Sequence, residues 1–145
     1  MLWSFSPRFQ PVIDEVDAID AAKVQRVVFC SGKVYYDLLE RRRAEKVTEV
    51  ALVRIEELYP FPADDYQAVL DRYANAREIV WCQEEPQNQG AWYQIRHRLQ
   101  APLHEKRMLH YAGRDGAAAP ATGLHAIHQR EQEALVAAAL NRAQS

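Results

Sequence analysis

The sequence has few of the residues that mark specialised classes of protein. Cysteine occurs twice in 145 residues, as Cys30 and Cys82, which excludes a disulfide-stapled scaffold. Both cysteines end apolar runs and are expected to be buried, reduced thiols, although a disulfide stays open if those runs are neighbouring strands. The net charge of -2 gives no broad attraction to nucleic acid or to an anionic membrane. No apolar run approaches the ~20 residues that cross a bilayer.

Short motifs of several enzyme classes are also missing. Neither the G-x-S-x-G of a nucleophile elbow nor the G-x-G-x-x-G of a dinucleotide-binding fold occurs. The S-G-K at 31–33 is not a P-loop, because the upstream glycine is absent and no hydroxyl follows the lysine. The five histidines do not show the spacing of a zinc site. The first twenty residues lack the charged start and apolar core of a secretion signal, which predicts a cytoplasmic protein.

What the chain does contain is an alternation of strand and helix patterns. Short apolar runs predict strands at 26–30, 49–56, 78–82 and 107–113. Apolar residues at helical spacing predict helices at 33–46, 62–73, 90–99 and 123–140. Right-handed crossovers between such elements give an α/β fold of three layers, a mainly parallel sheet of four to five strands with helices on both faces. We assign 25–145 to this domain and 1–24, which has no clear period, to a linker or packed extension.

The same patterns predict which side chains are buried. In the last helix, four residues are expected to face the sheet: Leu124, Ile127, Leu135 and Ala138. The three arginines at 41–43 are interpreted as a solvated helix end, with a basic docking patch as the alternative. Large aromatic residues are more numerous than a small core needs, so some are expected at a partner surface.

Polar residues follow the predicted strands. Because binding groups collect at the carboxyl ends of parallel strands, residues 31–33, 56–57, 83–85 and 113–114 are expected at one edge of the sheet. Ser31 and Lys33 flank a glycine at a helix start, which fits either an anion-binding turn or a plain strand-to-helix turn. Glu84 and Glu85 are interpreted as acids near the start of the next helix, with a general base or metal ligand as the alternative.

Five strings in this order add a resemblance to a known family. They are RVVFCSGKVYYDLLERR, VALVRIEELYPFP, VWCQEEPQNQGAW, YAGRDGAAAPATG and HQREQEAL. Together they closely resemble the C-terminal domain of the first component of 2-oxoglutarate dehydrogenase, over roughly 25–140. The layout is more distantly similar to the third domain of transketolases. The string RFQPVID near the start resembles the segment that joins this domain to the preceding one, so 1–24 is expected to extend from a preceding domain.

The resemblance implies an oxidoreductase of the tricarboxylic acid cycle. The full enzyme decarboxylates 2-oxoglutarate with thiamine diphosphate (thiamine pyrophosphate) and magnesium, and succinylates a lipoyl group. Its implied partners are the preceding domains, a homodimer partner and the lipoyl-bearing second component, in the cytoplasm or in the mitochondrial matrix of a eukaryote. The G-D-G that introduces the family's magnesium site is absent here. We therefore expect this chain alone to hold no thiamine diphosphate and to be inactive, with no catalytic residue or metal ligand of its own.

Two groups of site residues follow from the resemblance. An acyl-CoA or AMP effector is expected at four residues: Ser31, Lys33, Arg54 and Arg114. A contact with other domains is expected at the corner formed by six: Gln83, Glu84, Glu85, Asn88, Gln89 and Trp92. The alternative function is a free-standing interaction or nucleotide-binding regulatory module with this fold. The same domain from a pyruvate or branched-chain relative fits the strings less well.

Overall fold

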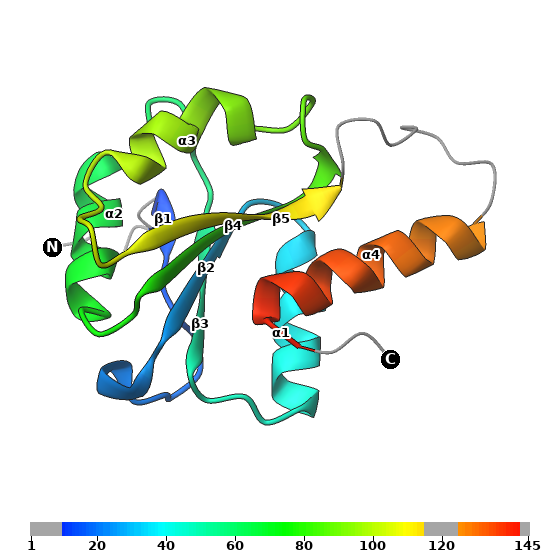
Figure 1. The fold of residues 1–145 in the computed structure, drawn as a ribbon, viewed down its shortest axis with the longest axis horizontal. Helices are drawn as coiled ribbons and strands as arrows, with labels where there is room; N and C mark the ends of the chain where they lie inside the picture. Colours follow the sequence, from blue (N-terminus) through cyan, green and yellow to red (C-terminus); the bar gives the residue numbers. More distant parts are fainter. Residues whose placement is uncertain (1–9, 115–124, 143–145) are drawn as a thin grey trace, which may run out of the picture.

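The computed structural model describes residues 10–114 and 125–142, which form one sheet with helices on both faces (Figure 1). The strands are β1 (Val12–Ile13), β2 (Arg26–Cys30), β3 (Val50–Ile55), β4 (Glu78–Pro86) and β5 (Met108–Arg114). The helices are α1 (Val34–Ala44), α2 (Ala63–Arg72), α3 (Trp92–Gln100) and α4 (His125–Leu140), with a short 3-10 helix, η2 (Ala21–Lys23). No helix in this described part combines the length and the apolar character that crossing a bilayer requires.

The sheet has the strand order β1-β3-β2-β4-β5. Strands β2 to β5 run parallel to one another, and β1 pairs antiparallel with the outer edge of β3. This confirms the predicted three-layer α/β fold with a mainly parallel sheet. All five residues of β2 are buried, because this central strand has helices on both faces.

Alternate residues of β2 belong to two cores. Val27 and Phe29 pack toward α2 and α3, whereas Val28 and Cys30 pack toward α1 and α4. Cys30 lies opposite Cys82 of β4, and both are free, buried thiols, as predicted. The apolar residues at helical spacing that predicted α2 and α3 are also buried: Tyr66, Val69, Leu70 and Tyr73 in the first case, and Trp92, Ile95 and Leu99 in the second.

The predicted inner face of α4 is wrong in part. Leu135 is buried, but the Ile127 side chain is 38% exposed and Ala138 is exposed; Leu124 lies outside the described residues. The amino-terminal half of α4 reaches past the end of β5 (Figure 1), and residues 125–130 are all exposed. The helix also packs against both the sheet and α1, and this wide contact buries Val136 and Leu140 instead of Ala138.

Residues 11–17 run along the outer edge of β3. Val12 pairs with Ile55, and the N–H of Glu56 donates to the carbonyl oxygen of Pro11 at 2.7 Å. Further along, the Glu15 carboxylate accepts the N–H of Leu52 at 2.8 Å. This part of the predicted extension therefore covers the β3 edge, while its origin in a preceding domain stays a prediction.

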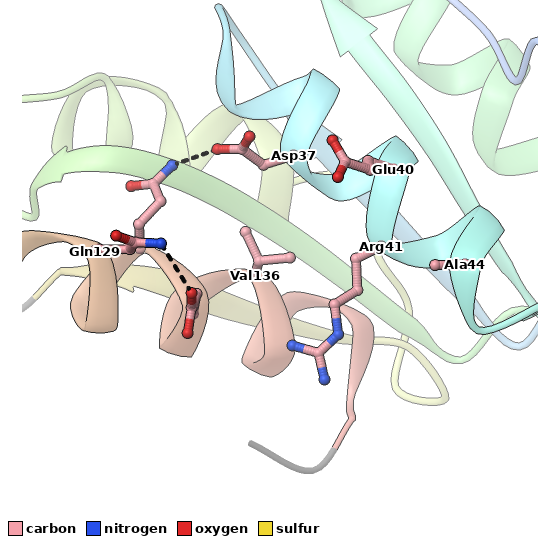
Figure 2. A pocket seen from close by; sticks show the side chains of 8 residues that line it. Asp37, Glu40, Arg41, Ala44, Gln129 and Val136 are labelled. Atoms are coloured by element: carbon pink, nitrogen blue, oxygen red, sulfur yellow. Dashed lines mark hydrogen bonds between the residues drawn. The ribbon is translucent and has the colours of Figure 1, made fainter. Parts of the chain in front are cut away.

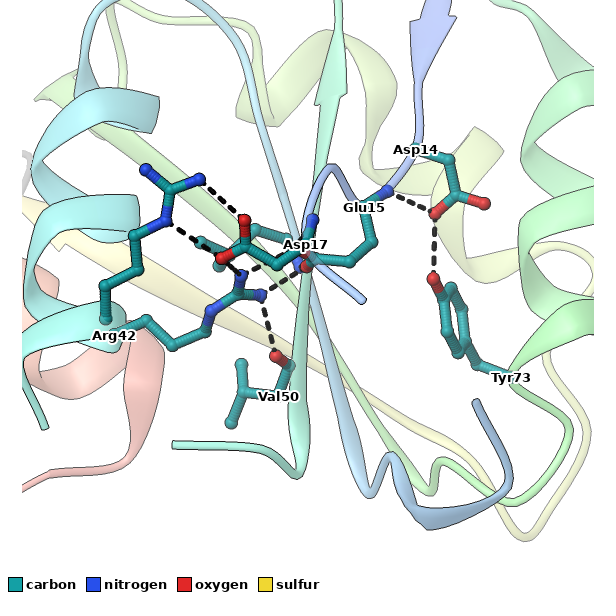
Figure 3. Close-up of polar contacts among 8 residues, drawn as sticks. Asp14, Glu15, Asp17, Arg42, Val50 and Tyr73 are labelled. Atoms are coloured by element: carbon teal, nitrogen blue, oxygen red, sulfur yellow. Dashed lines mark hydrogen bonds and ion pairs between the residues drawn. The ribbon is translucent and has the colours of Figure 1, made fainter. Parts of the chain in front are cut away.

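The interpretation of residues 41–43 as a solvated helix end is wrong for Arg42, whose side chain is only 2% exposed. Figure 3 shows its guanidinium between the Glu15 carboxylate, the Asp17 carboxylate and the carbonyl oxygen of Val50. Arg43, which is exposed, also binds Asp17. Nothing in the local spacing of the arginines indicates this, because their acidic partners lie 25 to 27 residues earlier in the chain.

Candidate functional site

The carboxyl ends of β2, β3, β4 and β5 share one edge of the sheet because these strands are parallel. Polar residues lie at this edge, as the sequence predicted: 31–33 and 56–57 follow β2 and β3, whereas 83–85 and 113–114 are among the last residues of the longer strands β4 and β5. The connection after β2 leads to α1 on one face of the sheet, and the connection after the adjacent strand β4 leads to α3 on the other face. The two connections therefore diverge at this edge. Such a switch point is the usual place for a ligand in an open α/β sheet.

Gln83 organises the corner at the end of β4. Its side chain is buried, and its Oε1 accepts hydrogen bonds from the indole N–H of Trp81 at 2.8 Å and the backbone N–H of Trp92 at 3.1 Å. Its Nε2 donates to the carbonyl oxygens of Glu85 at 3.2 Å and Pro86 at 3.1 Å. All four hydrogen-bonding positions of the amide are therefore used within the domain.

Gly90 completes this corner. A Cβ at this position would stand 2.5 Å from the Nε2 of Gln83, closer than real contacts allow. The turn before it is closed by the N–H groups of Gln89 and Gly90, which both donate to the carbonyl oxygen of Pro86. Glycine is needed here because the backbone passes directly over the Gln83 amide.

The six residues of the predicted interdomain corner do not all face outward. Gln83 and Trp92 are buried, and Glu84 is half-buried, with its carboxylate accepting a hydrogen bond from Gln132 at 3.1 Å. Glu85, Asn88 and Gln89 are exposed. The outward part of the corner is thus limited to these three side chains, and their contact with another domain stays a prediction.

Arg114 ties α4 to the ends of β4 and β5. Its guanidinium is buried and donates to the carbonyl oxygen of Glu84 at 2.6 Å, to the Gln132 Oε1 at 2.8 Å and to the Glu131 carboxylate at 3.2 Å. The Nε2 of His128 lies 3.3 Å from the same guanidinium, and accepts from it when that nitrogen carries no proton.

Arg54, in β3, belongs to a second group that includes two tyrosines of α1. It donates to the Tyr36 hydroxyl at 3.0 Å, pairs with Glu56 at 2.9 Å, and its guanidinium carbon lies 4.8 Å from the centre of the Tyr35 ring. Within the described residues, no hydrogen bond or ion pair joins this group to that of Arg114. Lys33 is exposed at the start of α1, and Gly32 before it has a φ of +83°. The four predicted effector residues thus lie at one edge, but two of them already have ionic partners.

Three tyrosines are exposed, Tyr36, Tyr59 and Tyr93, so some aromatic rings do reach the surface, while their contact with a partner stays a prediction. A groove of about 420 Å³ lies between α1 and α4, and Figure 2 shows Asp37, Glu40 and Gln129 around it. A second hollow lies at the opposite edge of the sheet, by the end of α2.

The described residues do not present an obvious catalytic set. Burial raises the pKa of Cys82 to about 12 and also raises the pKa of Cys30, so neither thiol is a ready nucleophile. No group of three or more potential metal-ligating His, Cys, Asp or Glu side chains comes together in the described ranges. The site is therefore a structural edge with charged and aromatic groups on its surface.

The family follows from a comparison with family models. The model for the C-terminal domain of 2-oxoglutarate dehydrogenase matches residues 4–140. The chain belongs to this family. The match includes the Gln83 corner, the Arg114 cluster and all five strands of the sheet.

Relatives of the 2-oxoglutarate dehydrogenase C-terminal family agree with this assignment. The chain is 52% identical over 133 residues to the 2-oxoglutarate dehydrogenase E1 component of Haemophilus influenzae, which covers 92% of this chain and 14% of that protein. It is 52% identical over 131 residues to the E1 component of Azotobacter vinelandii, covering 88% and 14%. A probable 2-oxoadipate dehydrogenase complex component E1 homologue of Dictyostelium discoideum is 40% identical, covering 92% and 15%. The chain thus spans about one seventh of the length of these relatives.

Proposed function

We propose that the chain serves as the C-terminal domain of a 2-oxoglutarate dehydrogenase E1 component. The observation that carries this proposal is the 52% identity to E1 components across about nine tenths of the chain. In the proposed enzyme, 2-oxoglutarate is decarboxylated with thiamine diphosphate and magnesium, and the succinyl group passes to a lipoyl arm of the second component. The preceding domains, a second subunit and the lipoyl-bearing component are the proposed partners, and the cytoplasm, or the mitochondrial matrix in a eukaryote, the proposed location.

The role proposed for this domain is to shape and support the assembly. The internally satisfied Gln83 corner gives a rigid support for the exposed side chains of Glu85, Asn88 and Gln89. Because the described residues bring together no metal-ligating cluster, we assign the cofactor and the chemical steps to the other domains. That the chain alone is inactive stays a prediction.

A chimera tests the proposal. The matching region of the Haemophilus influenzae E1 component is replaced by this chain, and reduction of an artificial electron acceptor is measured with 2-oxoglutarate and with 2-oxoadipate. We expect activity that prefers 2-oxoglutarate, and none from the isolated chain. A folded chimera that turns over neither substrate would contradict the proposal and would favour an independent interaction module.

We also propose an anion-binding role for the start of α1. Its support is the turn at Gly32, the exposed Lys33 and the location at the switch point between β2 and β4. Titration calorimetry with AMP and with acetyl-CoA is compared for the parent chain, for Lys33→Ala and, as a control, for Lys23→Ala, since Lys23 is also exposed. We expect Lys33→Ala alone to lose binding; no heat with either ligand would end this idea.

A further inference from the structure

Helix α3 presents a basic face to the solvent. It packs on the sheet through Trp92, Ile95 and Leu99, on the side opposite to α4 (Figure 1). Its other residues are all exposed: Tyr93, Gln94, Arg96, His97, Arg98 and Gln100. The sequence contains no aspartate or glutamate from 86 to 104, so neither the helix nor the turns beside it offset the charge of the two arginines.

The arginines of α3 differ from most others in the part of the chain that the structure describes. Arg42, Arg54 and Arg114 are typical of the majority, because each binds a carboxylate of the domain itself. Within 10–114 and 125–142, neither Arg96 nor Arg98 has an ion pair. The charge of these two side chains therefore has no partner in the fold described here and is available to a second molecule.

Two exposed tyrosines lie beside these arginines. The Arg96 guanidinium carbon is 5.1 Å from the centre of the Tyr93 ring, and Tyr93 is 48% exposed. Tyr59, just before α2, is 57% exposed, and its hydroxyl donates to the Oε1 of Gln94. Tyrosine and arginine are among the residues enriched at the centres of protein interfaces, where large side chains in few conformations give strong contacts.

The two arginines lie on opposite flanks of the outward side of α3. At 3.6 residues per turn, Arg96 and Arg98 point about 200° apart, with His97 between them. Arg98 lies one turn beyond Gln94, on the flank of Tyr59, whereas Arg96 lies on the flank of Tyr93. A chain that crosses α3 therefore meets a cation on each flank, about 10 Å apart across the helix, which is the length of about three extended residues.

This pattern favours an acidic protein segment over other anions. A guanidinium binds a carboxylate through two parallel hydrogen bonds, so two arginines can hold two acidic side chains. Nucleic acid binding draws on many phosphate contacts, roughly 6–10 in a typical complex, and a chain with a net charge of -2 gives it no further attraction. Binding to an anionic membrane needs apolar side chains that enter the lipid, and the exposed positions of α3 hold no aliphatic residue.

We propose that the outward side of α3 is a docking surface for an acidic segment of a partner protein. Arg96 and Arg98 each bind one carboxylate of this segment, and Tyr93 and Tyr59 pack against the chain that joins the two acids. The inference rests on the charges and rings of α3 and not on the E1 activity proposed above, so the outcome of the chimera experiment does not bear on it.

A peptide titration followed by NMR tests the docking surface. The probe is a short peptide with glutamate at every third position, added to the chain at low ionic strength while the backbone amide shifts are recorded. We expect saturable shifts that are concentrated at 92–100 and that weaken as salt is added, because exposed ion pairs are screened. The same peptide with glutamine in place of glutamate is expected to cause no such shifts.

Substitutions in α3 test the two contacts. Arg96→Ala and Arg98→Ala are each expected to weaken binding of the glutamate peptide about fivefold, the upper end of the range for an exposed ion pair. Both side chains are exposed, so the fold stays intact, and the remaining amide shifts verify this. Arg77→Ala is the matched control, because Arg77 is also exposed and has no ion pair among the described residues, and it leaves binding unchanged.

Two kinds of result would overturn the proposal. The first is the absence of saturable shifts with the glutamate peptide, or shifts at 92–100 that persist when Arg96 and Arg98 are both alanine. The second is tighter binding at α3 by a single-stranded oligonucleotide or by phosphatidylserine vesicles than by the peptide, which would assign this face to a phosphate-bearing partner.

Discussion

Single residues at the end of β4 show how a polar side chain can hold a corner together. Gln83 lies 2% exposed between two tryptophans and the turn that follows, with each of its amide positions bonded. A neutral amide suits this place because a buried charge in the same position would lose far more solvation. Its role is to keep the strand end, the turn and the start of α3 in one arrangement.

Replacing Gln83 tests this role. Gln83→Ala leaves the indole N–H of Trp81 and the N–H of Trp92 buried without acceptors, and is expected to lower the free energy of unfolding by about 2–4 kcal/mol in urea denaturation. Gln89→Ala, on the exposed side of the turn, changes it by less than about 0.5 kcal/mol. Gly90→Ala is destabilising in the parent, and less so once Gln83 is alanine, because the clash is with the Gln83 amide. Additive losses would argue against this contact.

Arg42 provides a matched comparison with its neighbour Arg43. Arg42→Ala leaves the Glu15 carboxylate, itself 4% exposed, without its cation, and is expected to cost about 3–5 kcal/mol of unfolding free energy. Arg43→Ala removes an ion pair at the surface and costs less than about 1 kcal/mol. Thermal and urea unfolding of the two variants measure this difference. Equal losses would show that the buried pair of Arg42 and Glu15 stabilises the fold no more than the surface pair of Arg43 and Asp17.

The lowered pKa of Asp17 predicts that the stability of the fold falls in acid. Hydrogen bonds from Arg43 and Arg42 lower its pKa to about 2, against an opposing effect of burial. Because the folded-state pKa lies below the unfolded value of about 3.9, the stabilisation is complete above pH ~4 and is lost as pH falls through 2. Asp17→Asn is therefore expected to flatten the decline in unfolding free energy between pH 4 and 2. Chemical denaturation at each pH measures this decline. A parent and variant with parallel pH profiles would contradict this.

At the scale of elements, α4 packs in a way that periodicity does not predict. Its last turns are apolar on every side, so a stripe drawn at helical spacing has no unique position. The sheet and α1 together select Leu135, Val136, Ala139 and Leu140 for burial. Arg114 then holds the middle of the helix through Glu131 and Gln132.

Two truncations in α4 distinguish its halves. Leu135→Ala is expected to cost about 2–4 kcal/mol, because it opens a cavity in the core between α4, α1 and the sheet. Ile127→Ala truncates a side chain that is 38% exposed and costs less than about 1 kcal/mol. Urea unfolding at low protein concentration measures both. A large loss of unfolding free energy for Ile127→Ala under these conditions would show that Ile127 packs in the core, as the sequence pattern predicted.

At the scale of the whole molecule, the domain has a complete core and two different edges. Both faces of the sheet are covered by helices, and the β3 edge is covered by residues 11–17. The carboxyl edge carries exposed tyrosines and acids, and within residues 10–114 and 125–142 no strand pairs with the outer edge of β5. A domain that spans about one seventh of its relatives therefore has its outward chemistry at two edges, which is where contacts with the rest of an assembly are expected.

The sequence by itself determined the order of elements and the layers. Runs such as 26–30 and 78–82 are too apolar to have an exposed face, so they had to be central strands, and the spacing of Tyr66, Val69 and Leu70 placed α2 on the sheet. The parallel order of the strands then predicted that the polar residues at their carboxyl ends lie at one edge of the sheet. These features are local or depend on a general rule of handedness, and a single sequence is enough to read them.

Tertiary structure alone decided which charges are buried and which edges are open. Arg42 reads as one of three solvated arginines until the chain brings Glu15 and Asp17 beside it, and Arg114 reads as a free cation until α4 packs across it. Ion pairs and edges depend on residues that are distant in sequence, and their energy depends on how much water the surrounding elements exclude. No local pattern carries that information.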